Sequence, residues 1–290
     1  MKQFLVENYV RSVPELKLSG KSFKYLLRVR RHRVGDILAL TFPNGEKFPY
    51  RISDIDAGRS EVTLQRCEPR ADGKKDWAEQ VLSQGLSELE TCSSFRIILL
   101  QWLLKGGKMD SLVRQATEIG VRWIVPVCGE FSLVRNPGAN KRERYQRIIK
   151  EARQQSNSPV ASDITEAKNL DDALALLPQL ITVAANETKQ PSASKTNRQT
   201  PCDSVKICCT EKSGKTKTMH ELAAQDFKVA VIAVGCEGGI SDAEYKMLEA
   251  AGFAYCHFNT NILRAETAGI YALAALQTIK MEETVWQLKE

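Results

Sequence analysis

The chain has 290 residues, of which 43% are hydrophobic and 26% charged, an ordinary composition for a globular protein that buries a core. This composition excludes global disorder, collagen and coiled coil, and the length suits two domains. No apolar run approaches the roughly 20 residues of a membrane span, and charges interrupt the first residues, unlike a signal peptide, so we expect a cytoplasmic protein.

Residues 1–75 carry the whole net positive charge of the chain. They contain 16 Lys and Arg against 9 Asp and Glu, whereas the remaining 215 residues contain 25 against 26. A basic surface confined to one segment suits a phosphate backbone, because each neutralised phosphate releases counterions, although a charge run is more often a solvated face. We favour a polyanion partner, with contacts from the basic segment 24–33: Lys24, Arg28, Arg30, Arg31 and Arg33.

The same residues are predicted to form a small β-rich module of strands and turns. A turn at 33–36 leads into a strand at 37–41, and Asn-Gly at 44–45 is typical of a tight hairpin turn before a returning strand at 48–52. Residues 61–65 alternate polar and apolar side chains, as a half-buried strand does. Three apolar residues of the basic segment are alternative core residues of this module: Leu26, Leu27 and Val29.

After a polar, turn-forming stretch at 69–75 the pattern changes to that of an α/β domain. Two amphipathic helical stripes, at 109–119 and 145–152, lie among continuous apolar runs. Such alternation favours a parallel sheet covered on both faces. A polar segment at 186–203 has no periodicity and is interpreted as a flexible surface insertion. The predicted strands are 97–103, 121–128, 180–184, 205–209, 229–234 and 253–258.

The cysteines and histidines do not indicate a metal. The eight cysteines form no C-x-x-C pair, and the three histidines are scattered. Several cysteines fall inside apolar runs, where a free thiol behaves as a small hydrophobe. A disulfide framework or a zinc site is therefore the less favoured interpretation.

The C-terminal stretch contains the most informative pattern. The buried strand 229–234 runs into the glycine-bearing turn 235–239, where absent side chains let backbone approach a ligand. Residues 241–244 match a capping box that opens a helix closed by Gly252. A second strand leads to 259–268 and a final helix. Loops at the carboxyl ends of parallel strands are where an open α/β sheet binds ligands, although each could be an ordinary strand–helix connection.

The final helix is dense in small residues, which permit close backbone approach. Its tight partner is either a second copy of the chain or another element of the same chain, and the sequence does not separate the two. No G-x-G-x-x-G is present, so a dinucleotide fold is poorly supported. The small residues are Ala265, Ala268, Gly269, Ala272, Ala274 and Ala275.

Four ordered motifs resemble those of the RsmE family, the bacterial 16S ribosomal RNA uridine-N3 methyltransferases. Residues 104–121 (LKGGKMD, then ATEIGV) are similar to the segment that opens that family's methyltransferase domain. Residues 149–156 (IKEARQQS) resemble its next block, and 234–239 (VGCEGG) and 262–268 (ILRAETA) its cofactor motifs. The basic segment also fits, so the resemblance covers nearly the whole chain.

The resemblance implies a PUA-like β-barrel that binds RNA at 1–72 and a SPOUT-type α/β domain at 73–290. In that domain the C-terminal segment passes through a trefoil knot, an exception to the rule that chains do not knot. It also implies S-adenosylmethionine as cofactor, a homodimer, and 16S ribosomal RNA of the small subunit as partner. The chain departs from the family with Cys236 in place of Pro, Phe258-Asn259 in place of Leu-Gly, and Asn261 in place of Arg.

Site residues follow from the matching motifs. Arg264 is expected to hold the uracil oxygens as negative charge develops on them. Glu266 or Glu237 would position Arg264 or accept the proton. The alternative role of Arg264 is a structural ion pair, and the alternative role of the two glutamates is to stabilise the loops. Weaker RNA contacts are Lys105, Lys108 and Arg135. The expected cofactor contacts are Cys209, Thr210, Gly235, Glu237, Gly238, Phe258, Asn259, Ile262, Leu263 and Thr267.

Two other functions remain open from the sequence. A SPOUT enzyme that methylates a ribose 2′-oxygen or a transfer-RNA base would share the sheet and the cofactor. An RNA-binding protein with a decayed cofactor pocket would keep the basic module without the activity.

Overall fold

The computed structural model describes residues 3–6, 9, 12–42, 47–67, 95–134, 139–188, 202–212, 214 and 216–285. The chain divides into two compact units, 1–89 and 90–290. The boundary predicted after residue 72 lies outside the described residues, as do the Asn-Gly turn at 44–45, Arg135 and most of the predicted insertion.

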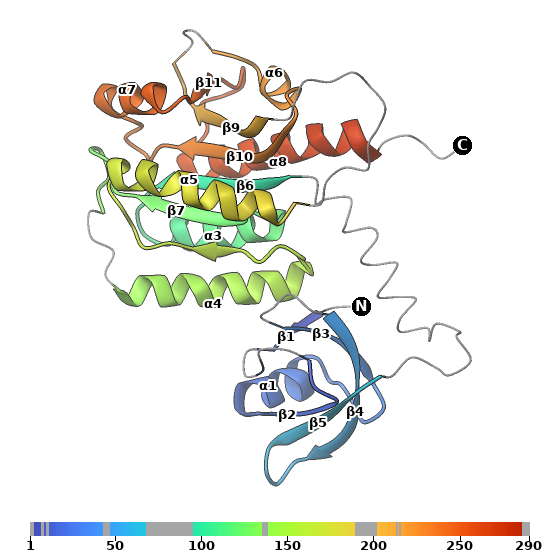
Figure 1. The fold of residues 1–290 in the computed structure, drawn as a ribbon. Helices are drawn as coiled ribbons and strands as arrows, with labels where there is room; N and C mark the ends of the chain where they lie inside the picture. Colours follow the sequence, from blue (N-terminus) through green and yellow to red (C-terminus); the bar gives the residue numbers. More distant parts are fainter. Residues whose placement is uncertain are drawn as a thin grey trace. The chain divides into compact units, whose positions relative to one another are not determined.

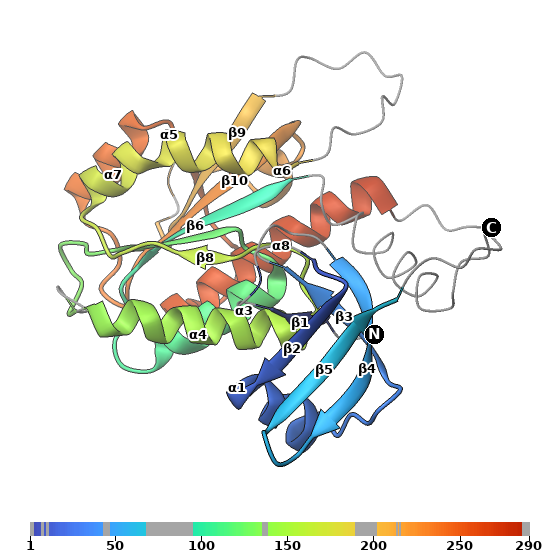
Figure 2. The same cartoon turned by 60° about the horizontal axis from the view of Figure 1, so that its bottom comes forward.

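The smaller unit is a curled five-stranded sheet (Figures 1 and 2). Its edge strand β1 pairs parallel with β3, and the other pairs are antiparallel. The register of β4 against β5 shifts between Ile52 and Asp54, an irregularity that bends and twists a strand. The strands predicted at 37–41, 48–52 and 61–65 are confirmed. In sheet order the strands are β1 (Gln3–Leu5), β3 (Ile37–Thr41), β4 (Lys47–Asp56), β5 (Glu61–Arg66) and β2 (Glu15–Ser19).

The prediction of strands and turns alone was wrong for the basic segment, which begins in a helical turn. α1 (Gly20–Lys24) continues into the π-helical turn η1 (Tyr25–Val29). Phe23 and Leu26 are buried in the core of this unit, three positions apart on one side of the turn, whereas Val29 is 64% exposed. Leu26 is thus a core residue, and the arginines that follow it project from the turn and the loop after it.

The larger unit is built on a six-stranded sheet in which every pair is parallel, as predicted. The strand order β11-β9-β10-β6-β7-β8 places the last three strands of the chain together on one side of the sheet. The strands are β6 (Arg96–Trp102), β7 (Trp123–Val127), β8 (Asp163–Ile164), β9 (Cys202–Cys209), β10 (Phe227–Val234) and β11 (Ala254–Cys256).

Helices cover both faces of this sheet. In Figures 1 and 2, α5 lies on one face and α3 and α8 lie on the other, with α4 packed against α3. Strand residues such as Ile98, Leu99 and Ile232 are fully buried between these layers. The helices are α3 (Lys108–Ile119), α4 (Ala139–Ser156), α5 (Leu170–Asn186), α6 (Met219–Ala223), α7 (Asp242–Ala250) and α8 (Ala265–Val285).

The apolar run 180–184 was predicted as a strand, and this was wrong, because it forms the end of α5. A short apolar run has the same composition in a buried helix and in a strand. The helical period appears only over the longer window, where the buried residues recur every three or four positions. They are Leu170, Ala173, Leu177, Leu180 and Ala184.

The local signals near the C-terminus fold as expected. Ser241 caps α7 and forms a complete capping box with Glu244, and Gly252 just after that helix has a φ of +84°. β9, β10 and β11 are parallel neighbours, so the segments that leave them emerge at one edge of the sheet. Among the described residues, no helix is both long and apolar enough to cross a membrane.

Candidate functional site

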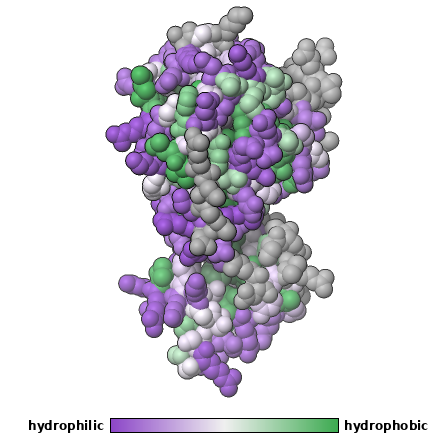
Figure 3. All heavy atoms as spheres, turned by 90° about the vertical axis from the view of Figure 1, so that its left-hand side faces the viewer, coloured by the Kyte–Doolittle hydropathy of each residue, from purple (hydrophilic) through white to green (hydrophobic). Residues whose placement is uncertain are grey.

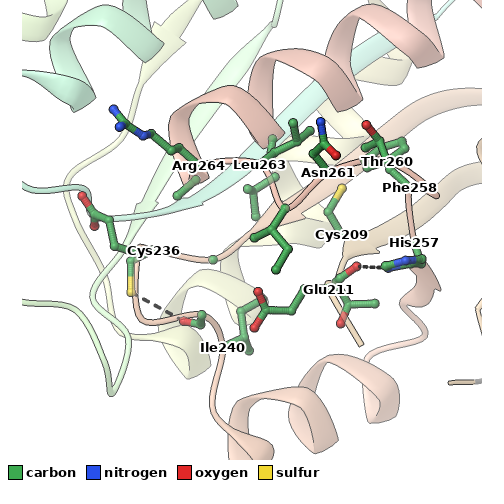
Figure 4. Close-up of a pocket in the computed structure, with 18 of the residues that line it drawn as sticks. Cys209, Glu211, Cys236, Ile240, His257, Phe258, Thr260, Asn261, Leu263 and Arg264 are labelled. Atoms are coloured by element: carbon green, nitrogen blue, oxygen red, sulfur yellow. Dashed lines mark hydrogen bonds between the residues drawn. The ribbon is translucent and has the colours of Figure 1, made fainter. Parts of the chain in front are cut away.

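A cavity of about 400 Å³ lies where the chain leaves β9, β10 and β11 (Figure 4). Its wall is formed by residues of three turns, 209–211, 234–240 and 257–265, together with three helix residues: Lys108 at the start of α3, Tyr245 of α7 and Ala268 of α8. In Figure 4, Arg264 and Cys236 lie toward one end and His257 and Phe258 toward the other. Cavities of this size, with apolar walls and a few polar groups, accommodate small organic ligands.

The turn after β10 is compact because Gly235 has no side chain. A Cβ added there would lie 2.9 Å from Ile240 Cγ1 and 3.0 Å from the backbone carbon of Gly239. The Gly239 amide donates to the Cys236 carbonyl at 2.9 Å, and the Cys236 thiol donates to the Gly239 carbonyl at 3.5 Å. The glycines therefore close the turn tightly and expose its backbone to the cavity.

The turns after β9 and β11 are joined through Thr210. Its amide donates to the Cys256 carbonyl at 2.9 Å, and its carbonyl accepts from His257 Nδ1 at 3.0 Å. Its hydroxyl lies 3.0 Å from that of Tyr245 on α7. Phe258 packs edge-on against Tyr271 of α8, with ring centroids 4.9 Å apart. Two segments of the cavity wall are thus fixed against each other.

Gln101, near the end of β6, forms hydrogen bonds with the start of the turn after β10. Its side chain is fully buried, and Nε2 donates to the carbonyls of Val234 and Gly235, each at 3.3 Å. A buried amide that binds two backbone carbonyls of a turn limits the movement of that turn. Nothing in the sequence pattern singled out Gln101.

Lys108 links the two glutamates that the motifs indicated. Its Nζ lies 3.0 Å from Glu237 Oε1 and 3.4 Å from Glu266 Oε2, and the Lys105 amide donates to Glu237 Oε1 at 3.3 Å. Burial is the largest single effect and opposes ionisation of Glu237, but the hydrogen bonds from Lys108 and from backbone amides and the charge of Lys108 together outweigh it, so the pKa of Glu237 is lowered. The hydrogen bond to Glu237 likewise raises the pKa of Lys108. Lys108 and Glu237 are therefore charged at neutral pH.

Arg264 lies just before α8 and its side chain is exposed at the cavity. Among the residues that the structure describes, it forms no ion pair, because both neighbouring glutamates contact Lys108 instead. Its guanidinium donors are thus available to a molecule that enters the cavity.

The cysteines of this region are buried thiols. Burial raises the pKa of Cys208 to about 12 and that of Cys256 to about 11, and it raises the pKa of Cys209 well above its ordinary value. Thiols in such surroundings are poor nucleophiles and poor metal ligands. Within the described parts of the chain, no three His, Cys, Asp or Glu residues are grouped as a metal site would require.

Comparison with known proteins identifies the family. Residues 91–277 match the family described as RNA methyltransferase domain, and residues 18–65 match the RNA methyltransferase PUA domain. The chain belongs to the RNA methyltransferase family.

Its curated relatives carry the name Ribosomal RNA small subunit methyltransferase E, which confirms the resemblance to the RsmE family. That of Borreliella burgdorferi is 26% identical, over 90% of this chain and 89% of the relative. The enzyme of Bacillus subtilis is 22% identical, over 94% of this chain and 93% of the relative. That of Synechocystis is 30% identical over 70% of this chain and 62% of the relative.

Solved structures confirm the fold class. Ribosomal RNA small subunit methyltransferase E of Neisseria gonorrhoeae, bound to S-adenosylmethionine, superposes with a TM-score of 0.70 at 21% identity, over 96% of this chain and 98% of that one. A Legionella pneumophila protein described as a methyltransferase, in complex with the same cofactor, has a TM-score of 0.68 at 20% identity. The match covers 95% of this chain and 96% of that one. The α/β domain with a parallel sheet and the preceding PUA domain are therefore as expected.

In this methyltransferase, seven of the ten residues expected to contact a cofactor line the cavity: Cys209, Thr210, Gly235, Glu237, Phe258, Ile262 and Leu263. Gly238, Asn259 and Thr267 do not line it. Glu211, His257 and Thr260 also line it and were missed, although each is next in sequence to a residue that was chosen. Tyr245 and Lys108 come from helices, and no local signal in the sequence would have placed them at the cavity.

The basic residues expected to bind RNA lie mostly on the methyltransferase's smaller unit. Arg30 is partly buried, because its Nε donates to the Tyr25 hydroxyl at 2.9 Å. The loop around them is shaped by Asp36, whose carboxylate accepts from the Arg33 amide and from His32, each at 3.0 Å. The Arg33 amide and His32 lower the pKa of Asp36. The exposed members are Lys24, Arg28, Arg31 and Arg33, and Lys105 on the larger unit.

Proposed function

We propose that this methyltransferase transfers a methyl group from S-adenosylmethionine to N3 of a uridine in 16S ribosomal RNA of the small ribosomal subunit. Membership of the RNA methyltransferase family and relatives named for small-subunit ribosomal RNA support the substrate. The single observation that carries the chemistry is the cavity at the ends of β9, β10 and β11, with an uncommitted arginine at its edge.

The residues around the cavity fit this cofactor. The volume suits a nucleoside-sized ligand, and the walls combine apolar side chains, such as Ile262 and Leu263, with the exposed backbone of the turn after β10. We assign cofactor contact to the ten residues named from the motifs, of which seven line the cavity. When bound, S-adenosylmethionine supplies an electrophilic methyl group on a sulfonium sulfur.

Arg264 is proposed to bind the uracil. N3 of uridine is protonated at neutral pH and normally paired, so the base must be unpaired or flipped out before it reacts. As N3 loses its proton, negative charge spreads to O2 and O4, where a fixed cation lowers the barrier. Arg264 cannot act as a base at neutral pH, but its guanidinium can donate to these oxygens.

A carboxylate next to Lys108 is proposed to take the N3 proton. The lowered pKa of Glu237 makes it a poor proton acceptor, so Glu266 is assigned this role. Its other role is positional, because Lys108 fixes both carboxylates at the cavity edge.

The exposed basic residues of the smaller unit are proposed to contact RNA phosphates, together with Lys105, whereas Lys108 is assigned to the two glutamates. A ribosomal RNA substrate also implies a cytoplasmic location. The affinity of such a surface falls steeply with salt.

The trefoil knot and the homodimer expected from the family are part of this proposal. β11 lies at the sheet edge beside β9, yet the following helix α8 packs against α3 and β10, a return path that supports a knot. The inner face of α8 packs against the rest of the same chain, since a Cβ at Gly269 would lie 3.1 Å from Gln101 Oε1. The outer face is uncharged and exposed, which supports a dimer contact at Tyr271, Ala274 and Thr278.

The product tests this function directly. Small ribosomal subunits and, in a parallel reaction, transfer RNA from a strain that lacks the enzyme are incubated with the purified protein and labelled S-adenosylmethionine. The nucleosides are then identified by mass spectrometry. N3-methyluridine in 16S ribosomal RNA is expected. A methyl group on ribose, label only in transfer RNA, or RNA binding without label would each contradict the proposal.

A further inference from the structure

The turn after β7 presents two large apolar side chains to solvent. Phe131 is 47% exposed and Leu133 is 74% exposed, whereas Ser132 between them is only 3% exposed. Single exposed apolar residues are common on protein surfaces. A pair on one turn beside a reaction site calls for a specific explanation.

This turn is held rigidly. The Gly129 amide donates to Ser132 Oγ and the Ser132 amide donates to the Gly129 carbonyl, each at 3.1 Å. The Glu130 amide donates to the buried Glu244 Oε1 at 3.0 Å, and that oxygen also accepts from the Trp102 indole at 3.1 Å. The exposure of the apolar side chains is therefore fixed by the fold.

The turn contacts Gly238, which belongs to the turn after β10. A Cβ added at Gly238 would lie 2.9 Å from Phe131 Cβ, so the two residues are in contact. An open hollow of about 510 Å³ beside them is lined by Glu130, Phe131, Ser132, Leu133 and Gly238. Gly238 belongs to the turn whose neighbours line the reaction cavity. Figure 3 faces this edge of the sheet and shows hydrophobic groups among hydrophilic ones.

We propose that Phe131, supported by Leu133, stacks against a base of the RNA strand next to the target uridine. The inference rests on the proposed function. A uridine withdrawn from its stack leaves the face of a neighbouring base uncovered, and an aromatic ring covers such a face without sequence preference. Among the residues that the structure describes, no Lys or Arg lines the hollow, and Glu130 would repel a phosphate, so the described part of the hollow suits a base better than the backbone.

A second copy of the chain fits this surface less well. A stable protein interface buries about 800 Å² on each partner, which is far more than two side chains on a turn provide. The uncharged outer face of α8 is the surface proposed above for that purpose.

The test compares Phe131→Ala, Phe131→Trp and Leu133→Ala with Val183→Ala, which removes a 39% exposed apolar side chain from α5. Methyl transfer to small ribosomal subunits gives KM and kcat, and calorimetry gives the Kd for S-adenosylmethionine. Phe131→Ala is expected to raise the KM for RNA roughly tenfold, since stacking on one aromatic ring contributes about that factor or more. The cofactor Kd stays nearly unchanged, Phe131→Trp retains the wild-type KM, and Val183→Ala has no effect.

Three results would overturn the inference. They are an unchanged KM for RNA in Phe131→Ala, an equal loss of cofactor affinity, and dissociation of a dimer measured by light scattering. Failure of the proposed function is distinguishable, because the wild-type protein would then transfer no methyl group to RNA. Fluorescence anisotropy with a 16S ribosomal RNA fragment still compares the affinities of the wild-type and Phe131→Ala proteins in that case.

Discussion

Arg264 is the single residue on which the proposed chemistry depends most. Its guanidinium is not held by either nearby glutamate, so Arg264→Ala removes substrate contacts and leaves the cavity wall otherwise intact. We expect methyl transfer to fall at least about a hundredfold, as for other losses of a group that stabilises developing negative charge. Cofactor affinity, measured by calorimetry, should be nearly unchanged. Equal losses of activity and cofactor affinity would refute this division of roles.

Lys108 predicts a pH dependence. It lowers the pKa of Glu237, so the interactions of that ionised carboxylate are present above its ordinary pKa and lost as the pH falls through the lowered value. Lys108→Gln raises the pKa of Glu237, and the loss then begins at a higher pH. Cofactor affinity measured between about pH 4 and 7 should show this upward shift, with Lys228→Gln, an exposed lysine paired with Asp203, as control. Coincident profiles for Lys108→Gln and the wild type would contradict the assignment.

Site residues that lie in continuous motifs could be predicted from the sequence, whereas those whose partners are distant in the sequence could not. Arg264 and the glycines of 235–239 lie in continuous motifs next to predicted strands. The Lys108–Glu237 contact joins residues 129 positions apart, and Lys108 was interpreted as an RNA contact because an isolated lysine gives no sign of its partner. Gln101 was hidden for the same reason, inside an apolar strand.

At the scale of elements, the turn after β7 depends on Gly129. A Cβ there would lie 2.1 Å from Trp102 Nε1 and 2.6 Å from Glu244 Oε1, and both side chains are buried. Gly129→Ala is therefore expected to lower the free energy of unfolding by about 3 kcal/mol, the upper range for overpacking. Urea denaturation measures it, and Gly107→Ala, at a site with no heavy atom within 4 Å, should change it little. Similar midpoints for the two variants would show that the turn adapts.

The basic segment predicts the salt dependence of RNA binding. Arg28 and Arg31 are exposed, whereas Arg30 is partly held by Tyr25. Reversing Arg28 and Arg31 to Glu should reduce the slope of log affinity against log salt by about two, one for each lost phosphate contact. Arg59→Glu, on a separate turn of the same unit, serves as the matched control. An unchanged slope would place the RNA contacts elsewhere.

Element types were predictable where the pattern was long or the turn chemistry specific. The parallel strands, the capping box at Ser241 and the helix end at Gly252 followed from such signals. The run 180–184 was misassigned because five apolar residues fit either a strand or a buried helix. The turn at 20–29 was missed because its two buried residues, Phe23 and Leu26, stand among charged neighbours.

At the scale of the whole molecule, the sheet and its strand directions follow from hydrophobic periodicity, but the strand order does not. β11 pairs with β9 and not with β10, the strand that precedes β11 in the sequence. This strand order brings the turns after β9, β10 and β11 together at one cavity. Local patterns carry no information on such an order. The glycine-bearing and asparagine-bearing turns after two parallel strands indicated a ligand site, but the expectation that the turn after β9 joins them rested on the family resemblance.

The central claim is that these three turns form one pocket for S-adenosylmethionine beside Arg264. A crystal structure of the protein with the cofactor tests it most directly. The account predicts the adenosyl group between the turns after β9, β10 and β11, with the sulfonium methyl facing the Arg264 side of the cavity. Cofactor bound elsewhere, or a cavity closed by Phe258 with no ligand inside, would contradict it.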